Sequence, residues 1–226
     1  MFSLSWLHEF LLSHSTLNNM IVKVCGMRDP HQMQALENMG VDLMGMIFFP
    51  KSPRYVETEG FCPCGLPQKI AKVGVFVKAD IDSVASCVKK YNLSFVQIHG
   101  GEDVDYARQL KAQTGVKIIK AVSVSGVDDV KNIQTEWESV ADYMLFDYKC
   151  VGYGGSGQQF DWAVLDEYTL NIPFLLSGGV GADDAEAVKN IRHPKFAGVD
   201  VNSKFEISPA NKDIEKVKTF LSVIRE

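Results

Sequence analysis

The stretch "IVKVCGMRDPHQMQALENMGVDLMGMIF", residues 21–48, holds two strand-like runs with a helix-like run between them. The runs "IVKVC" and "LMGMIF" are short and apolar, which predicts buried strands. The intervening "DPHQMQALENMG" begins with an aspartate that can cap a helix, continues with a proline suited to the first helical position, and ends on a glycine. This order of strand, helix and strand predicts two parallel strands joined by a helical crossover.

The same alternation continues to the end of the chain. Strand-like runs occupy residues 21–25, 43–48, 72–77, 95–98, 117–122, 143–146, 173–177 and 196–201. Helix patterns separate most of them, but residues 57–70 contain two prolines and two glycines and predict a loop with at most a short turn of helix. Repeated units of this kind predict an α/β fold, a (β/α)8 TIM barrel whose second helix is degraded.

An open, doubly wound sheet is the alternative architecture. A dinucleotide-binding sheet of that kind carries G-x-G-x-x-G after its first strand, whereas this chain has a single glycine there, in "CGMRDP". We therefore expect one barrel domain over residues 20–226. Residues 1–19 contain an apolar stretch with no Lys or Arg ahead of it, which argues against a secretory signal. We expect them to be an N-terminal extension outside the barrel core.

The composition narrows the classes of partner. The chain has 226 residues, 46% of them hydrophobic and 23% charged, which is typical of a globular domain. A net charge of -5 argues against nucleic acid, and no apolar run reaches the ~20 residues of a membrane span. The five scattered cysteines favour reduced thiols and a cytoplasmic location. The C-P-C at residues 62–64 lacks the two-residue spacer of zinc ligand pairs, so we expect no metal there.

Reactive and polar residues stand where the predicted strands end, which in a barrel is the side of the active site. Cys25 ends the first strand, Arg54 lies in the loop after the second, His99 follows the fourth and Asp147 the sixth. A thiolate and a carboxyl facing one pocket would suit a cofactor-free isomerisation, in which a base and an acid move a proton. The alternatives are a buried inert thiol at Cys25, a helix cap or ion pair at Asp147 and a solvated charge at Arg54.

Three glycine-rich stretches lie late in the chain, at residues 152–160, 177–184 and 198–203. The loops after the last two strands of such barrels commonly bind phosphate, because backbone N–H groups can approach the anion there. A helix that starts near Gly181 would add the positive end of its dipole. The sequence therefore predicts a phosphorylated small molecule as substrate, although the same glycines could simply make tight turns.

Seven motifs in order give the chain a family resemblance. They are "KVCGMRDP", "GMIFFPKSPRYV", "VGVFV", "VQIHG", "LFDYKCVGYGGSGQQFDW", "LLSGGV" and "GVDVNS". From about Met20 to the C-terminus the chain resembles phosphoribosylanthranilate isomerase, an enzyme of tryptophan biosynthesis. The reaction that this resemblance implies is the Amadori rearrangement of N-(5-phosphoribosyl)anthranilate to 1-(2-carboxyphenylamino)-1-deoxyribulose 5-phosphate, with no cofactor and no metal.

The resemblance also assigns roles to single residues. It makes Cys25 the general base and Asp147 the general acid, places Arg54 at the anthranilate carboxylate and lets His99 line the pocket. The residues that it implies for phosphate binding are Gly155, Ser156, Gly157, Gly178, Gly179, Asn202 and Ser203. After the last strand this chain reads Lys204-Phe205 where many members of the family have Gly-Val. Lys204 would then either add charge beside the phosphate or point to solvent.

Two other functions stay open at this point. One is a related phosphate-binding barrel such as indole-3-glycerol-phosphate synthase, for which Lys23 in the first strand could be the catalytic lysine, but no glutamate ends the second, fourth or seventh strand. The other is a barrel that binds a sugar phosphate without turning it over. We expect a monomer or a homodimer.

Overall fold

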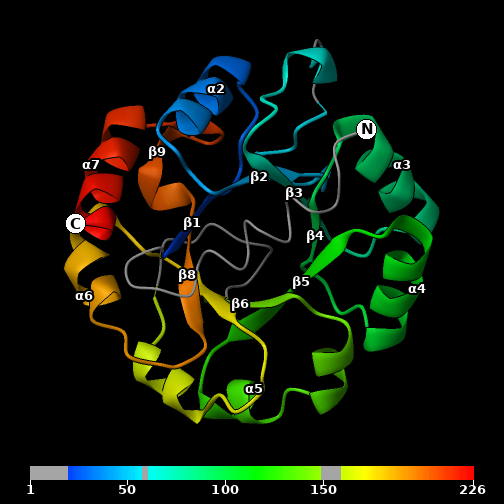
Figure 1. Cartoon of the computed structure of the whole chain (residues 1–226), viewed down its shortest axis with the longest axis vertical. Coiled ribbons are helices and arrows are strands. Elements are labelled where there is room, and N and C mark those ends of the chain that lie inside the picture. Colours follow the sequence, from blue (N-terminus) through cyan, green and yellow to red (C-terminus); the bar gives the residue numbers. More distant parts are fainter. Residues whose placement is uncertain (1–19, 58–60, 149–158) are drawn as a thin grey trace.

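Eight parallel strands close into a barrel with helices around it (Figure 1). The computed structural model describes residues 20–57, 61–148 and 159–226. The strands follow one another around the barrel in chain order, and β8 closes it by pairing with β1. They are β1 (Ile21–Val24), β2 (Leu43–Ile47), β3 (Ala71–Phe76), β4 (Phe95–Ile98), β5 (Lys117–Val124), β6 (Tyr143–Tyr148), β7 (Phe174–Leu176) and β8 (Phe196–Val201). The predicted fold is confirmed.

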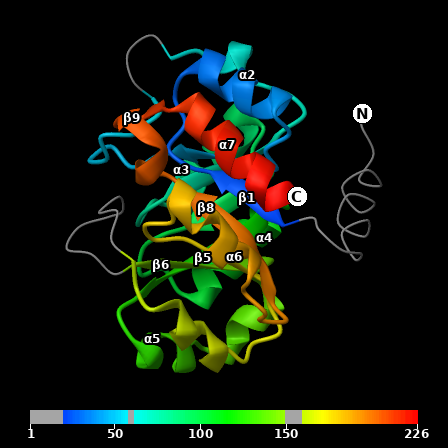
Figure 2. The ribbon, with the colours of Figure 1, turned by 90° about the vertical axis from the view of Figure 1, so that its left-hand side faces the viewer.

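The helices form the outer layer, as Figures 1 and 2 show from two directions. They are α2 (Pro30–Asn38), α3 (Ile81–Tyr91), α4 (Val104–Thr114), α5 (Val127–Lys131), α6 (Ala185–Lys189) and α7 (Ile214–Arg225). An aspartate caps each of the four longer helices, and its carboxylate accepts a backbone N–H of the first turn. The crossover after β2 contains a single 3₁₀ turn (Pro63–Gly65) among its described residues, so the predicted degraded helix is also confirmed.

The apolar side chains divide between the inside and the outside of the barrel because neighbouring residues of a strand point to opposite faces. The buried cluster inside the barrel comprises Leu43, Val73, Phe95, Ile119, Ala121, Tyr143, Leu145 and Leu175. A larger buried cluster fills the layer between the strands and the helices. Inward-facing residues therefore recur at every second position, and the last one of each strand faces the open end of the barrel.

Closure of the barrel brings two oppositely charged residues side by side. In the pairing of β1 with β8, Lys23 stands opposite Asp200. After β8 the chain forms a small antiparallel hairpin, β9 (Glu206–Ser208) with β10 (Asn211–Lys212), before it enters α7. This hairpin lies beside the carboxyl end of β1, because Lys212 donates to the side-chain oxygen of Asn202, which lies against Gly26.

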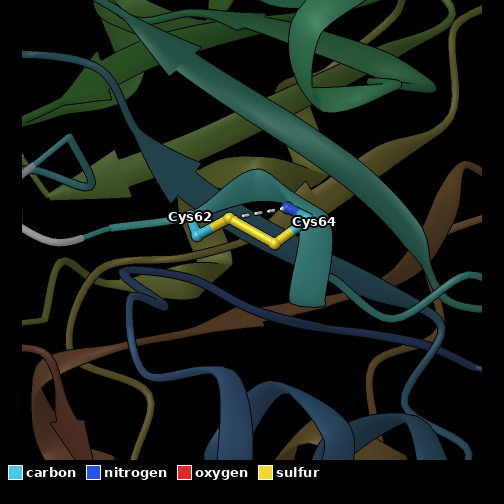
Figure 3. The surroundings of a disulfide bond; sticks show 2 residues. All are labelled: Cys62 and Cys64. Atoms are coloured by element: carbon cyan, nitrogen blue, oxygen red, sulfur yellow. Dashed lines mark hydrogen bonds between the residues drawn. A yellow bond between two sulfur atoms is a disulfide. The ribbon is translucent and has the colours of Figure 1, made fainter.

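Cys62 and Cys64 form a disulfide within the crossover between β2 and β3 (Figure 3). The 3₁₀ turn bends the chain so that the backbone N–H of Cys64 also donates to the sulfur of Cys62 over 3.4 Å. Among the described residues the free cysteines are Cys25 and Cys87. The expectation of reduced thiols is therefore wrong for this pair, because a tight turn brings together two cysteines whose spacing had suggested a plain loop.

Candidate active site

A pocket opens at the carboxyl ends of the strands and gathers most of the described residues that the sequence analysis singled out. Its lining comes from the barrel interior and from the loops that follow the strands. The lining residues are Cys25, Ile47, Phe49, Ser52, Val75, Val77, Gln97, His99, Asp147, Tyr148, Ser177, Gly178, Gly179, Val180, Asp200, Asn202, Ser203 and Lys204. No group of three or more His, Cys, Asp or Glu side chains that could hold a metal ion occurs in the described part of the chain.

Cys25 lies directly after β1 and is only 4% exposed. Its backbone N–H donates to the carbonyl of Val201 over 2.9 Å, which ties it to β8. Gly26 then turns the chain out of the barrel with a φ of +74°, a left-handed conformation that favours glycine. On the other side, Gly45 of β2 leaves room for the thiol, since a Cβ there would lie 2.7 Å from the Cys25 sulfur.

A buried ion pair lies beneath Cys25. The Lys23 ammonium donates to a carboxylate oxygen of Asp200 over 2.8 Å, and the two side chains are 0% and 5% exposed. Burial raises the pKa of the Cys25 thiol, and the Lys23 ammonium offsets only part of that effect. Although burial alone would lower the pKa of Lys23, the Asp200 carboxylate, together with Cys25 when it is ionised, raises it. The thiol therefore favours its neutral form, and the ammonium groups of Lys23 and, to a smaller extent, Lys212 favour the thiolate.

Asp147 is the last residue of β6 that faces the barrel interior, and both of its carboxylate oxygens make contacts. One accepts the backbone N–H of Tyr148 over 2.9 Å, and the other lies 3.5 Å from Nε2 of His99. His99 follows β4, and its Nδ1 lies 3.1 Å from the amide nitrogen of Gln97. The structure thus brings Asp147 and His99 into contact, with side chains that are 15% and 17% exposed.

Arg54 lies beside the pocket, but its guanidinium group binds a carboxylate outside the pocket lining. Its Nε and Nη2 donate to the carboxylate of Glu206 over 2.6 to 3.0 Å, and it is absent from the residues that line the pocket. The Lys212 ammonium donates to the same carboxylate over 2.7 Å and to the side-chain oxygen of Asn202 over 2.7 Å. Burial alone would raise the pKa of Glu206, but Arg54 and Lys212 outweigh it, and the pKa is lowered. The stem of Arg54 also lies against Gly26, next to Cys25.

The expected phosphate-binding residues that the structure describes lie at one side of the pocket. Gly178 and Gly179 follow β7 with φ of +81° and +76°, and Asn202 and Ser203 follow β8. A side chain at Gly178 would collide with the backbone nitrogen of Tyr148, so glycine is required there. The residues expected from the preceding loop, Gly155, Ser156 and Gly157, lie outside the described residues.

The helix expected near Gly181 differs from the sequence-based prediction. The chain first makes a 3₁₀ turn (Ala182–Asp184), and α6 then has only five residues. The N–H of Gly181 donates to the Asp184 carboxylate over 2.7 Å, so its donor is already used. A strong helix-dipole contribution to phosphate binding is therefore not expected from this segment. Lys204, by contrast, is exposed and lines the pocket on the same side.

The partners that hold these residues were not predicted from the sequence. Lys23 pairs with Asp200 and Arg54 with Glu206 across separations of 177 and 152 residues, which no local pattern reports. The available signal was a charged residue inside each of two otherwise apolar runs, "IVKV" and "FAGVDV". A buried charge needs a partner, so the two could have been matched across the closed barrel.

Comparisons with known proteins identify the family of the chain. The sequence profile of the family described as "N-(5'phosphoribosyl)anthranilate (PRA) isomerase" matches residues 22–223. The chain belongs to the phosphoribosylanthranilate isomerase family. A relative named N-(5'-phosphoribosyl)anthranilate isomerase, from Parabacteroides distasonis, is 43% identical over 208 residues, which cover 91% of this chain and 93% of the relative. Another of the same name, from Phocaeicola vulgatus, is 41% identical over 92% of this chain and 98% of its own length.

Solved structures of the phosphoribosylanthranilate isomerase family share the fold. The enzyme from Thermotoga maritima superposes with a TM-score of 0.76 at 29% identity, over 91% of this chain and 98% of that one. A further structure, with a TM-score of 0.73 at 25% identity and the same coverage, contains reduced 1-(o-carboxyphenylamino)-1-deoxyribulose 5-phosphate. None of the helices in the described parts of this chain is long and apolar enough to cross a membrane.

Proposed function

We propose that this chain catalyses the Amadori rearrangement of N-(5-phosphoribosyl)anthranilate to 1-(2-carboxyphenylamino)-1-deoxyribulose 5-phosphate, in tryptophan biosynthesis. The observation that carries the proposal is that Cys25 and Asp147, a potential base and a potential acid from different strands, line one pocket in a member of this family. The glycines and polar residues after β7 and β8, on the same pocket, support the phosphorylated substrate.

The chemical steps follow from these two groups. Asp147 donates a proton to the ring oxygen of the ribose, the bond from C1 to that oxygen breaks, and the nitrogen lone pair forms a protonated Schiff base. The Cys25 thiolate then removes the proton from C2, and the electron pair moves to give the enolamine. Tautomerisation of the enolamine gives the ketone of the product. The substrate gains one proton from Asp147 and loses one to Cys25, so the steps balance with these two side chains.

Contacts at both ends of the substrate would hold the reacting carbons between the acid and the base. Gly178, Gly179, Asn202 and Ser203 would bind the phosphate, together with residues 155–157. Arg54 would meet the anthranilate carboxylate through Nη1, because its bonds to Glu206 use Nε and Nη2. Its stem lies against Gly26, so the carboxylate end would lie close to Cys25.

The test follows the loss of substrate fluorescence with purified protein. We expect Cys25→Ser to lower kcat by about 10²- to 10⁴-fold with little change in KM, because removal of a general base has effects of that size. The matched control is Cys87→Ser, which changes a free thiol on α3, away from the pocket lining, and should leave the rate unchanged. A near-wild-type rate for Cys25→Ser would remove Cys25 from the role of base.

A barrel that binds a sugar phosphate without turnover is the second candidate, and binding of the substrate without loss of its fluorescence would favour it. The related indole-3-glycerol-phosphate synthase activity has less support. That reading needs Lys23 as a catalytic amine, whereas the Lys23 ammonium is fully buried and bonded to Asp200. Assays of the isomerase substrate and of the synthase substrate with the same preparation separate the two enzyme activities from a barrel that only binds.

We also infer the setting of the reaction. Residues 20–226 would be the single catalytic domain, with residues 1–19 outside its core, since β1 starts at Ile21 and the family profile at residue 22. The free thiols of Cys25 and Cys87 support a cytoplasmic location, while the disulfide in the β2–β3 crossover counts against it. Thiol labelling in intact cells would decide. One solved relative is called dimeric, and light scattering would tell a monomer from a homodimer here.

A further inference from the structure

A chain of three polar side chains runs along the pocket from β4 to β6. The amide nitrogen of Gln97 lies 3.1 Å from Nδ1 of His99, and Nε2 of His99 lies 3.5 Å from a carboxylate oxygen of Asp147. Gln97 and His99 are two residues apart, so both point into the barrel from the same side of the strand. All three residues line the pocket.

The hydrogen-bonding capacity of the groups fixes where the protons lie. The amide NH2 of Gln97 can only donate, so Nδ1 of His99 must accept. A neutral imidazole then carries its proton on Nε2, which faces the Asp147 carboxylate. Gln97 thereby selects the tautomer of His99 that can donate to Asp147.

The other end of the Gln97 amide has no partner among the described residues. Its oxygen, Oε1, is buried without a hydrogen bond, and the residue as a whole is 1% exposed. Buried acceptors are nearly always paired, because an unpaired one loses its hydration without compensation. Because Gln97 lines the pocket, a donor group of a molecule bound there is the partner that the geometry leaves for this oxygen.

We propose that Gln97 has two roles in this site: it positions Asp147 through His99, and it accepts a hydrogen bond from a hydroxyl group of the sugar of the bound substrate. This inference rests on the proposed isomerase function. The sugar is the part of that substrate that must lie between the acid and the base, and its hydroxyl groups are donors. The amide therefore couples the presence of the substrate to the orientation of the carboxyl that protonates it.

The first test examines the free protein and needs no turnover. Long-range ¹⁵N-correlated NMR of the imidazole should place the His99 proton on Nε2. In Gln97→Glu an acceptor replaces the donor at the same size, so the ring should gain a proton on Nδ1. The matched control Gln134→Glu makes the same change at an exposed position outside the pocket and should leave the His99 signals unchanged. A proton on Nδ1 in the wild type would overturn the positioning role.

The second test is kinetic. Gln97→Met keeps the approximate volume of the side chain and removes both hydrogen bonds. Unlike Gln97→Glu, it adds no buried charge that could cause misfolding. We expect kcat to fall about tenfold to a hundredfold, with unchanged binding of inorganic phosphate. His99→Gln keeps an N–H donor toward Asp147 and should recover part of the kcat lost in His99→Ala. A kcat for Gln97→Met within twofold of the wild type would overturn the substrate contact. Absence of turnover in the wild type would instead refute the proposed function, and the NMR result would still decide the positioning role.

Discussion

Replacing Lys23 by methionine tests the buried ion pair beneath the candidate active site. The change keeps an unbranched side chain one atom shorter, and it leaves the Asp200 carboxylate without its cation in an interior where it is 5% exposed. Breaking a buried pair by removing one partner costs about 3–5 kcal/mol, which for a domain of this size is a fall in Tm of about 6–20 °C. Part of the cost is relieved when Asp200 takes up a proton, since burial already raises its pKa.

Urea unfolding followed by circular dichroism measures this loss. The double variant Lys23→Met with Asp200→Asn should recover at least about half of it, because no unpaired charge then remains inside. The control Lys218→Met removes an exposed ammonium, 68% exposed on α7, and should change the unfolding free energy by less than about 0.5 kcal/mol. A loss below about 1 kcal/mol for Lys23→Met, or a double variant as unstable as the sum of the single ones, would refute the reasoning.

The same variant has a second readout at Cys25. The Lys23 charge lowers the thiol pKa against the larger effect of burial, so its removal should raise that pKa further. The thiolate fraction at a given pH would then be smaller. Both the rate of alkylation by iodoacetamide and kcat/KM should therefore fall about tenfold for each unit by which the thiol pKa rises. In the wild type both rates should still be rising with pH above the ordinary thiol pKa. An alkylation profile that is identical in the wild type and Lys23→Met would show that the ammonium does not act on the thiol.

Three further results are expected. Gly45→Ala puts a Cβ 2.7 Å from the Cys25 sulfur, so it should lower the unfolding free energy by about 1–3 kcal/mol and also lower kcat. The control Gly65→Ala, with no atom within 4 Å of its Cβ, should change neither quantity. Equal behaviour of the two variants would contradict the packing argument. The lowered pKa of Glu206 means that the folded state binds its proton less readily than the unfolded chain, so its stabilisation is complete above pH 4.5 and is lost as the pH falls toward the folded pKa. The Glu206→Gln variant should therefore lose this part of the acid dependence in urea titrations, and an unchanged slope would count against the Arg54 and Lys212 contacts. Deletion of residues 1–19 should leave Tm and kcat unchanged, and an insoluble or inactive product would contradict the proposed domain boundary.

The barrel was predictable because its signals are local. Each strand is a short apolar run, and the predicted run 196–201 coincides with β8, while 143–146 missed only the last two residues of β6. The helices with aspartate caps were equally clear. The segments after β5, β6 and β7 carry short or 3₁₀ helices, whose formation depends more on packing than on a pattern in the chain.

The residues that line the candidate site were easier to predict from the sequence than the bonds between their side chains. Cys25 and His99 directly follow β1 and β4, and Asp147 is the penultimate residue of β6, so the fold alone places them at one opening. The pairing of Arg54 with Glu206 depends on the β9–β10 hairpin, which no periodic pattern in the sequence predicts. The disulfide of the β2–β3 crossover likewise depends on the bend of one turn, because the sequence gives only the spacing of its cysteines.

The pairing of β1 with β8 makes the site a property of the complete chain. Cys25 is made early in synthesis, but the strand that receives its backbone N–H and the carboxylate that neutralises Lys23 emerge about 175 residues later. Until then Lys23 has no Asp200 to meet, and closing the barrel around an uncompensated ammonium is unfavourable. In a nascent or truncated chain without β8, Lys23 lacks its partner, so burial of its ammonium becomes favourable only after the last strand has paired with β1.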